Sequence, residues 1–291
     1  MTTHLPKATL IRYPQGETNA TGTVTKTVPL DDNRSAILVD NTPFHPVDYQ
    51  WPDQPGDRGE IHCDGMVYPI VSCLTGAINL EDDALYLDTD IPVKKGADGW
   101  CFVVVHVVEG TPDLAGKTVQ LQVDASYRHA LDCGHSACHI TALALNRALQ
   151  GYWRKDPGRH DALGQIDFDQ LAITQSSIGE YQSTDRYRCG KSLKKKGLCA
   201  ADLFTDLNNI EQAVNQQLAA WLAEGGEIHV RCEGETLTDR RYWECQLGQE
   251  NKVVIPCGGS HATTLGALGN VSVSMHPLDE QTFEVITRCQ L

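Results

Sequence analysis

Two short stretches of this 291-residue sequence place histidine and cysteine side chains at spacings that suit a metal ion. In the first, His135 and His139 are four residues apart, so on a helix their imidazoles share one face. In the second, Cys257 and His261 flank a Gly-Gly-Ser turn, whose glycines let the backbone fold tightly enough for both side chains to reach one ion. Three imidazoles and one thiolate form a borderline-soft ligand set, which favours Zn²⁺ over Mg²⁺ or Ca²⁺.

A zinc ion at these residues could assist the hydrolysis of an ester. It would polarise the carbonyl or lower the pKa of bound water to about 7, and both roles need an open coordination position. We therefore hypothesise that at least one of the four residues, Cys257 first, binds weakly or not at all, because four filled positions are typical of a structural zinc. A thermolysin-type protease is excluded, since its general base is a Glu directly after the first histidine and Ser136 stands there.

Helical periodicity surrounds the first stretch. Apolar residues recur at helical spacing from His135 to Tyr152, with no Gly or Pro before Gly151, and predict a helix there. A second helix is predicted from Asp206 to Glu224, where Gly225 and Gly226 supply the stop signal.

The rest of the chain is dominated by strand patterns. Up to about Gly110, short apolar runs separated by Pro, Gly and Asp predict a small β-barrel; Thr111 to Gly116 is a polar connection. We therefore predict an α+β protein, with an N-terminal β-barrel-like domain at 1–110 and a zinc-binding domain at 111–291 that combines an antiparallel sheet with helices. The strands are expected at Ala36–Val39, Val67–Val71, Trp100–Val108, Thr118–Asp124, Glu227–Cys232, Lys252–Ile255, Val271–Met275 and Thr282–Thr287.

Composition narrows the partners and the compartment. The net charge of −14 and the pI near 5.1 argue against nonspecific binding to nucleic acid, including DNA. The stretch 186–196 has the opposite charge, with six basic residues in eleven and no acidic one, and could bind a phosphate backbone. Its basic residues are Arg186, Arg188, Lys191, Lys194, Lys195 and Lys196. Eleven cysteines without a C-x-x-C pair indicate reduced thiols, and no apolar stretch resembles a signal peptide or a membrane span, so we expect a cytoplasmic protein.

Together these motifs resemble the editing-domain family of alanyl-tRNA synthetase and its freestanding, AlaX-like trans-editing members. The H-x-x-x-H helix is followed, a little over a hundred residues later, by C-G-G-S-H, which is similar to the family's C-G-G-[ST]-H. Three further segments match family patterns. Val123-Asp124 with Arg128 matches V-D-x-x-x-R. Residues 42–46, T-P-F-H-P, match T-P-F-x-P, and residues 54–59, Q-P-G-D-R-G, match part of G-G-Q-P-x-D-x-G. A related domain occurs in threonyl-tRNA synthetase.

The resemblance implies a fold, a substrate and a set of residues. It implies the fold of the second additional domain of threonyl- and alanyl-tRNA synthetase. Because no synthetase core precedes the motifs, it also implies an editor that acts in trans. Such editors hydrolyse the ester that joins a wrong amino acid, usually serine or glycine on alanine tRNA, to the terminal ribose. On this resemblance the aminoacyl end would meet Gly258, Gly259 and Ser260. The sequence departs from the family where Asp48 to Asp53 replace a glycine run and where Cys138 stands for the usual Thr.

Other roles stay open in the sequence. No Asp or Glu near either motif can be identified as the general base; Asp124 and Cys138 are candidates, although Asp124 also suits a solvated or capping carboxylate at a strand end before a turn, and Cys138 a buried core position. Two other functions remain: a noncatalytic zinc protein that only binds tRNA or another partner, and a zinc hydrolase of a small ester or amide. The oligomeric state is not indicated.

Overall fold

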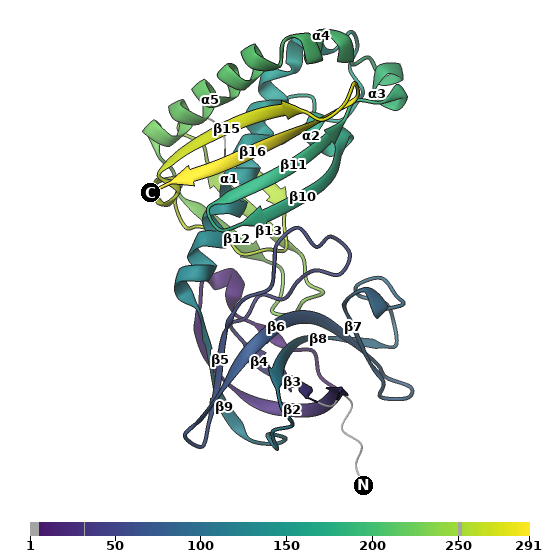
Figure 1. Cartoon of the computed structure of the whole chain (residues 1–291), viewed down its shortest axis with the longest axis vertical. Coiled ribbons are helices and arrows are strands. Elements are labelled where there is room, and N and C mark those ends of the chain that lie inside the picture. The colour runs from purple at the N-terminus through teal and green to yellow at the C-terminus, as the bar shows by residue number, and fades with distance from the viewer. Residues whose placement is uncertain (1–5, 32, 250–251) are drawn as a thin grey trace. The chain divides into compact units, whose positions relative to one another are not determined.

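The computed structural model describes residues 6–31, 33–249 and 252–291. These residues form two compact units, and each combines several stretches of the chain (Figure 1). The first unit contains 6–128, 230–241 and 257–260, and the second contains 129–229, 242–256 and 261–291. In the described residues, strands and helices are mixed and no doubly wound parallel sheet is present. The predicted α+β class is therefore confirmed.

The first unit is built on a seven-stranded antiparallel sheet. The strand order is β5-β9-β2-β3-β8-β6-β7, and β5 also pairs with β6. Its strands are β2 (Asn19–Asp31), β3 (Arg34–Val39), β5 (Gly59–Cys63), β6 (Met66–Asn79), β7 (Leu85–Leu87), β8 (Trp100–Glu109) and β9 (Thr118–Val123). The same unit holds the parallel pair β1 (Leu10–Ile11) and β4 (Asn41–Thr42), with the 3-10 turns η1 (Tyr13–Gln15) and η2 (Asp88–Asp90).

Strand β8 explains why the longest apolar run of the first unit forms a strand. Successive side chains of a strand point to opposite faces, so a strand buried on both faces must be apolar at nearly every position. Phe102 and Val104 lie in one hydrophobic core, whereas Val103 and Val105 lie in another. The exception is His106, which is fully buried on the same strand.

His106 is accommodated by two hydrogen-bonding contacts. Its Nε2 lies 2.8 Å from Thr42 Oγ1 and its Nδ1 lies 3.1 Å from the carbonyl oxygen of Ile37. Burial lowers the pKa of His106 to about 4. The imidazole is therefore neutral at physiological pH.

The second unit contains a four-stranded sheet, most of a three-stranded sheet and helices; residues 125–128, 230–232 and 241 of these elements belong to the first unit. A four-stranded antiparallel sheet has the order β10-β11-β16-β15, with β10 (Ile173–Gly179), β11 (Gln182–Arg188), β15 (Asn270–Pro277) and β16 (Thr282–Gln290). Strands β12 (Ile228–Cys232), β13 (Arg241–Gln246) and β14 (Lys252–Pro256) form a three-stranded sheet in that order. The helices are α1 (Ala125–Ala148), α2 (Phe168–Ala172), α3 (Lys191–Lys196), α4 (Ala200–Thr205) and α5 (Leu207–Glu224), with η3 (Gln150–Tyr152) and η4 (Leu265–Leu268).

Helix α1 begins at Ala125, so the predicted start at His135 is wrong. Asp124 caps the helix, because its Oδ1 accepts hydrogen bonds of 3.0 Å from the backbone N–H groups of Ser126 and Tyr127. Inside the helix, Gly134 lies where a Cβ atom would come within 2.5 Å of the carbonyl oxygen of Gly179. The glycine thus permits close approach of the turn between β10 and β11, and the helix continues through it.

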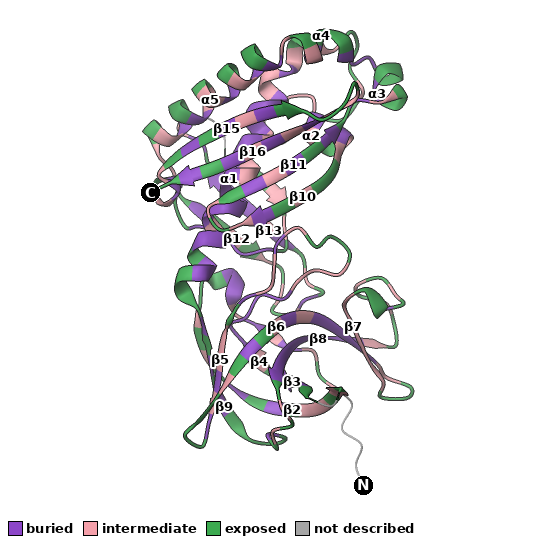
Figure 2. Ribbon diagram, viewed as in Figure 1, coloured by how far each residue is buried: buried purple, intermediate pink, exposed green. Residues whose placement is uncertain are grey.

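Helix α5 covers the edge of the four-stranded sheet, and its predicted extent is confirmed. The Asn215 amide donates to the carbonyl oxygen of Val273 at 2.9 Å and accepts from the N–H of Val273 at 2.8 Å. Val273 lies on β15, the edge strand, and these two hydrogen bonds satisfy its outward backbone groups (Figure 1). Buried positions alternate with intermediate or exposed ones along β11 and β16 (Figure 2). Among the described residues, no helix has both the length and the apolar character needed to cross a membrane.

Candidate metal centre

The three histidines of the two motifs come together in the second unit. His135 and His139 lie one turn apart on α1, with their ring centroids 4.9 Å apart. The ring of His261, from the segment that follows β14, lies 4.2 Å from that of His135 and 5.1 Å from that of His139. The helical spacing and the distant Gly-rich motif thus bring three imidazoles to one place.

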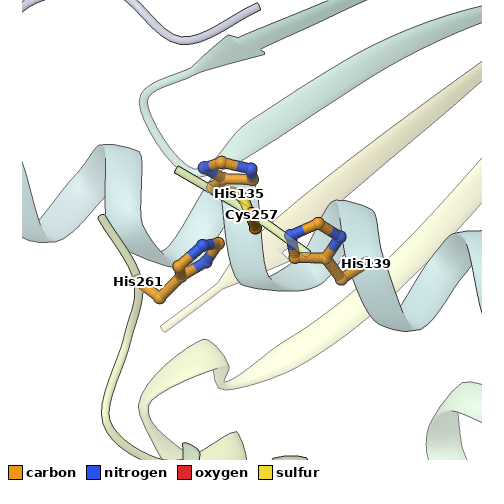
Figure 3. A group of neighbouring side chains, drawn as sticks. All are labelled: His135, His139, Cys257 and His261. Carbon is orange, nitrogen blue, oxygen red and sulfur yellow. The ribbon is translucent and has the colours of Figure 1, made fainter. Parts of the chain in front are cut away.

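Cys257 supplies the sulfur of the same group. It directly follows β14, and its Sγ and the ligand nitrogens of the three histidines all lie within 4.8 Å of one another (Figure 3). Burial raises the pKa of the Cys257 thiol to about 12 in the absence of an ion. A metal ion favours the deprotonated form of a coordinating thiol, so a bound cation would oppose this effect. The group could hold one metal ion.

The state of His139 fits a ligand. Its Nε2 is buried and has no hydrogen-bond partner among the described residues. Burial and the neighbouring His135 lower the pKa of His139 well below its usual value. The imidazole is therefore neutral, which is the form that binds metals, and a buried nitrogen without a partner is otherwise unfavourable.

Two residues to which the sequence assigned no supporting role contact the histidines. Ser136 Oγ lies 3.4 Å from His261 Nδ1 and accepts a 3.0 Å hydrogen bond from the N–H of Ala262. This contact orients the His261 ring through Nδ1, so Nε2 is the nitrogen that could face an ion. The fully buried indole of Trp243 lies 4.9 Å from the ring of His139 and 6.3 Å from that of His261, between centroids. Trp243 therefore excludes water from one side of the imidazoles.

The C-G-G-S turn is held by contacts within the first unit. Gln54 Nε2 donates to Ser260 Oγ at 2.8 Å, and the N–H of Ser260 donates to Gln54 Oε1 at 3.3 Å. The carbonyl oxygen of Gly258 accepts from the Tyr13 hydroxyl at 2.9 Å and from Arg241 Nε at 3.4 Å. The Q-P-G-D-R-G and C-G-G-S-H motifs therefore depend on each other, because the glutamine of one fixes the serine of the other.

The two candidate catalytic residues differ in their surroundings. The Asp124 carboxylate is exposed and caps α1. Cys138 is half-buried, and its Sγ donates to both oxygens of Asp185, at 3.6 and 3.5 Å. Burial raises the pKa of Asp185 to about 6. Sequence reasoning missed Asp185, because a buried carboxylate interrupts the apolar alternation by which a strand is recognised.

The basic stretch is divided between a strand and a helix. Arg186 on β11 lies 3.1 Å, Nε to Oε2, from Glu284 on β16, so its charge is compensated. The four lysines of α3 are exposed. The N–H of Arg154 donates to the carbonyl oxygen of Gly197 at 2.9 Å, which places the exposed pair Arg154 and Lys155 beside the end of α3. These two residues extend the lysine cluster and were not part of the predicted surface.

Comparisons with known proteins agree with the motifs. The alanyl-tRNA editing protein AlaX-M of Pyrococcus horikoshii is 25% identical over 244 residues, which are 83% of this chain and 81% of that protein. The alanine–tRNA ligases of Gluconobacter oxydans and Nostoc punctiforme are 26% and 24% identical over 83% and 80% of this chain. The matches cover 23% and 21% of the two ligases, so the chain spans less than a quarter of either. No family model matches the chain. The similarity to an editing protein and to these ligases confirms the predicted resemblance to the alanyl-tRNA synthetase editing-domain family.

Proposed function

We propose that this chain is a zinc-dependent aminoacyl-tRNA deacylase that acts in trans and removes serine or glycine wrongly attached to alanine tRNA. One observation carries the proposal. Three imidazoles and a thiol gather in a chain that is similar, over 83% of its length, to a protein named for alanyl-tRNA editing. A tRNA substrate also agrees with the cytoplasmic location expected from the sequence.

His135, His139 and His261 would hold the zinc ion, with Cys257 as a weaker fourth ligand. Three imidazoles suffice for a catalytic zinc and leave a position for the substrate. When bound, the ion would supply a Lewis acid that polarises the ester carbonyl. Ser136 keeps the His261 ring oriented, and Trp243 keeps water from one side of the imidazoles.

The Gly-rich turn would receive the aminoacyl end of the tRNA. Gly258 and Gly259 have no side chains, so the backbone there can approach a ribose and an ester closely. Ser260 is buried and fixed by Gln54, so it holds the turn in place. Cys138 would border the substrate from α1, whereas we assign Asp124 to capping that helix.

A basic surface in the second unit would bind the tRNA backbone. We define it as the α3 lysines with the adjoining basic pair, namely Lys191, Lys194, Lys195, Lys196, Arg154 and Lys155. The pKa of Asp279 is lowered mainly by a hydrogen bond from the backbone of Gln281 and to a smaller extent by the nearby Arg188, and Arg186 pairs with Glu284. These two arginines would therefore contribute less to phosphate binding than the lysines.

Deacylation of a panel of mischarged tRNAs tests the proposal. Seryl- and glycyl-tRNA for alanine should be hydrolysed, a chelator should abolish the reaction, and added zinc should restore it. His135→Ala is the control for hydrolysis by contaminating enzymes, because it should remain inactive after zinc is added. Binding of tRNA without hydrolysis would instead indicate a noncatalytic protein, and hydrolysis of small esters alone would indicate a different hydrolase.

A further inference from the structure

Asp185 on β11 is a buried carboxylate that is surrounded by neutral hydrogen-bond donors. It is 1% exposed. Ser176 Oγ donates to Oδ1 at 2.6 Å, Ser183 Oγ donates to Oδ2 at 3.0 Å, and Cys138 Sγ donates to both oxygens. Burying a carboxylate is costly, and such groups are usually paired with a cation. The hydrogen-bond partners of Asp185 among the described residues are all neutral. The Asp185 carboxylate therefore adds negative charge to this part of the second unit.

The fold places this carboxylate behind a residue that borders the metal centre. Asp185 is paired across the sheet with Ser176 on β10, and it alternates with exposed residues along β11. Cys138 lies three residues after His135 on α1, so its side chain neighbours the His135 imidazole along the surface of the helix. Asp185 therefore contacts α1 next to His135, through the Cys138 thiol.

The hydrogen bonds determine what the half-buried Cys138 and Ser176 can offer a ligand. A thiol or a hydroxyl has one hydrogen to donate and lone pairs that accept. Both side chains give that hydrogen to Asp185, so toward a ligand each acts as an acceptor. Two acceptor atoms with a negative charge behind them suit a cationic donor such as an ammonium group.

We propose that Cys138 and Ser176, backed by Asp185, form the subsite for the α-ammonium group of the aminoacyl ester. The proposal rests on the proposed function and adds to it the group of the substrate that is recognised. In every aminoacyl-tRNA the α-ammonium is bonded to the carbon next to the ester carbonyl. A subsite that adjoins the metal-binding face of α1 is therefore suitably placed for it. Asp185 is a positioning residue, because it acts through the thiol and the hydroxyl.

A binding measurement tests the subsite without relying on catalysis. The probe is the amide analogue 3′-deoxy-3′-(L-serylamino)adenosine, which resists hydrolysis, compared with its N-acetyl derivative, which has no α-charge. Calorimetry on the zinc-loaded protein should show that acetylation weakens binding roughly 30- to 100-fold, as expected for loss of a charged hydrogen bond. Equal affinity for the two probes would overturn the proposal.

Variants separate the positioning role from a general structural role. Asp185→Asn should bind the charged probe as weakly as the acetylated one while keeping its zinc. Asp169→Asn is the matched control, because Asp169 is another carboxylate of this unit, held at 2.8 Å by the Tyr187 hydroxyl, and it should keep the preference. If Asp185→Asn does not fold, Cys138→Val and Ser176→Ala should reduce the preference, whereas Cys138→Ser should retain it. A preference that survives the loss of both acceptors would contradict the subsite.

Kinetics distinguish the subsite from the proposed function. For seryl-tRNA, Asp185→Asn should raise KM more than it lowers kcat, and for N-acetylseryl-tRNA it should change neither by more than about twofold. If the wild-type protein hydrolyses both substrates equally well, the subsite is wrong and the deacylase remains. If it hydrolyses no aminoacyl-tRNA, the proposed function fails, and equal binding of the two probes would still decide against the subsite.

Discussion

Arg128 Nε lies 2.8 Å from Asp57 Oδ1, and both side chains are almost completely buried. The pair joins three of the motifs that carry the family resemblance. Arg128 Nη2 also donates to the carbonyl oxygen of Pro43 at 2.9 Å, and Asp57 accepts a 2.5 Å hydrogen bond from the N–H of His45. The T-P-F-H-P, Q-P-G-D-R-G and V-D-x-x-x-R segments of the first unit are therefore held by one ion pair.

Removing one charge from this pair should destabilise the protein strongly. Asp57→Asn leaves the guanidinium buried without its counter-charge, for which the expected loss is about 3 kcal/mol of unfolding free energy. Urea unfolding followed by circular dichroism measures it. Asp31→Asn is the control, because Asp31 pairs with Arg34 on the surface, and its unfolding midpoint should not move. If Asp57→Asn and Asp31→Asn change the unfolding free energy by equally small amounts, the buried pair stabilises the protein no more than the surface pair does.

The four candidate ligands should not contribute equally to metal binding. His139→Ala should reduce the zinc content from about one ion per chain to nearly none, because a three-histidine site cannot lose an imidazole without losing most of its affinity. Cys257→Ser should keep most of its zinc at saturating metal and lose it sooner to a chelator. Elemental analysis after dialysis measures both, with the exposed His229→Ala as control. Complete loss of zinc in Cys257→Ser would make the thiol an essential ligand.

His106 should make the free energy of unfolding depend on pH. Its pKa is 6.5 when unfolded and about 4 when folded, so the folded state favours the neutral ring. His106 contributes fully to the unfolding free energy above pH 6.5. This contribution, roughly 3 kcal/mol, is lost as the pH falls from 6.5 through 4. The unfolding free energy of the metal-free protein should therefore fall more between pH 7 and 4 than that of His106→Gln. Parallel pH profiles would exclude this role.

Reversing the charge of the α3 lysines should weaken tRNA binding without loss of zinc. Lys194, Lys195 and Lys196 are exposed, and each phosphate that is no longer neutralised should reduce the slope of log affinity against log salt by about 0.7 to 0.9. The triple change to Glu, measured by filter binding at several salt concentrations, should therefore lower both the affinity and the slope. The same change at the exposed Lys7, Lys94 and Lys117 controls for net charge. Equal effects of the two triple variants would count against a specific surface.

The elements with regular apolar patterns could be predicted from the sequence. The run from Trp100 to Val108 is confirmed as β8, because a strand buried on both faces is apolar at nearly every position. Helix α5 is confirmed from its periodicity and its glycine stop. Strand β2 was missed, because its alternation places threonines on the exposed side and few large apolar residues on the other.

The gathering of the four candidate ligands could also be predicted, but the residues that contact them could not. Residue type and spacing are enough to place His135 and His139 on one helical face. By contrast, Trp243 on β13 contacts the His139 ring and Asp185 on β11 contacts Cys138, and only the tertiary structure shows which strand positions face α1. Ser136 was visible inside the first motif, but its contact with His261 depends on a residue 125 positions later.

The position of Trp243 against two imidazoles has a spectroscopic consequence. With its ring centroid 4.9 Å from that of His139, the indole lies within the range at which an open-shell ion such as Co²⁺ quenches excited states. Titrating the zinc-free protein with Co²⁺ should dim the emission of this one fluorophore, and Trp243→Phe should remove that response while the other four tryptophans keep emitting. Trp243 would thus report by its fluorescence whether an ion is bound at the candidate metal centre.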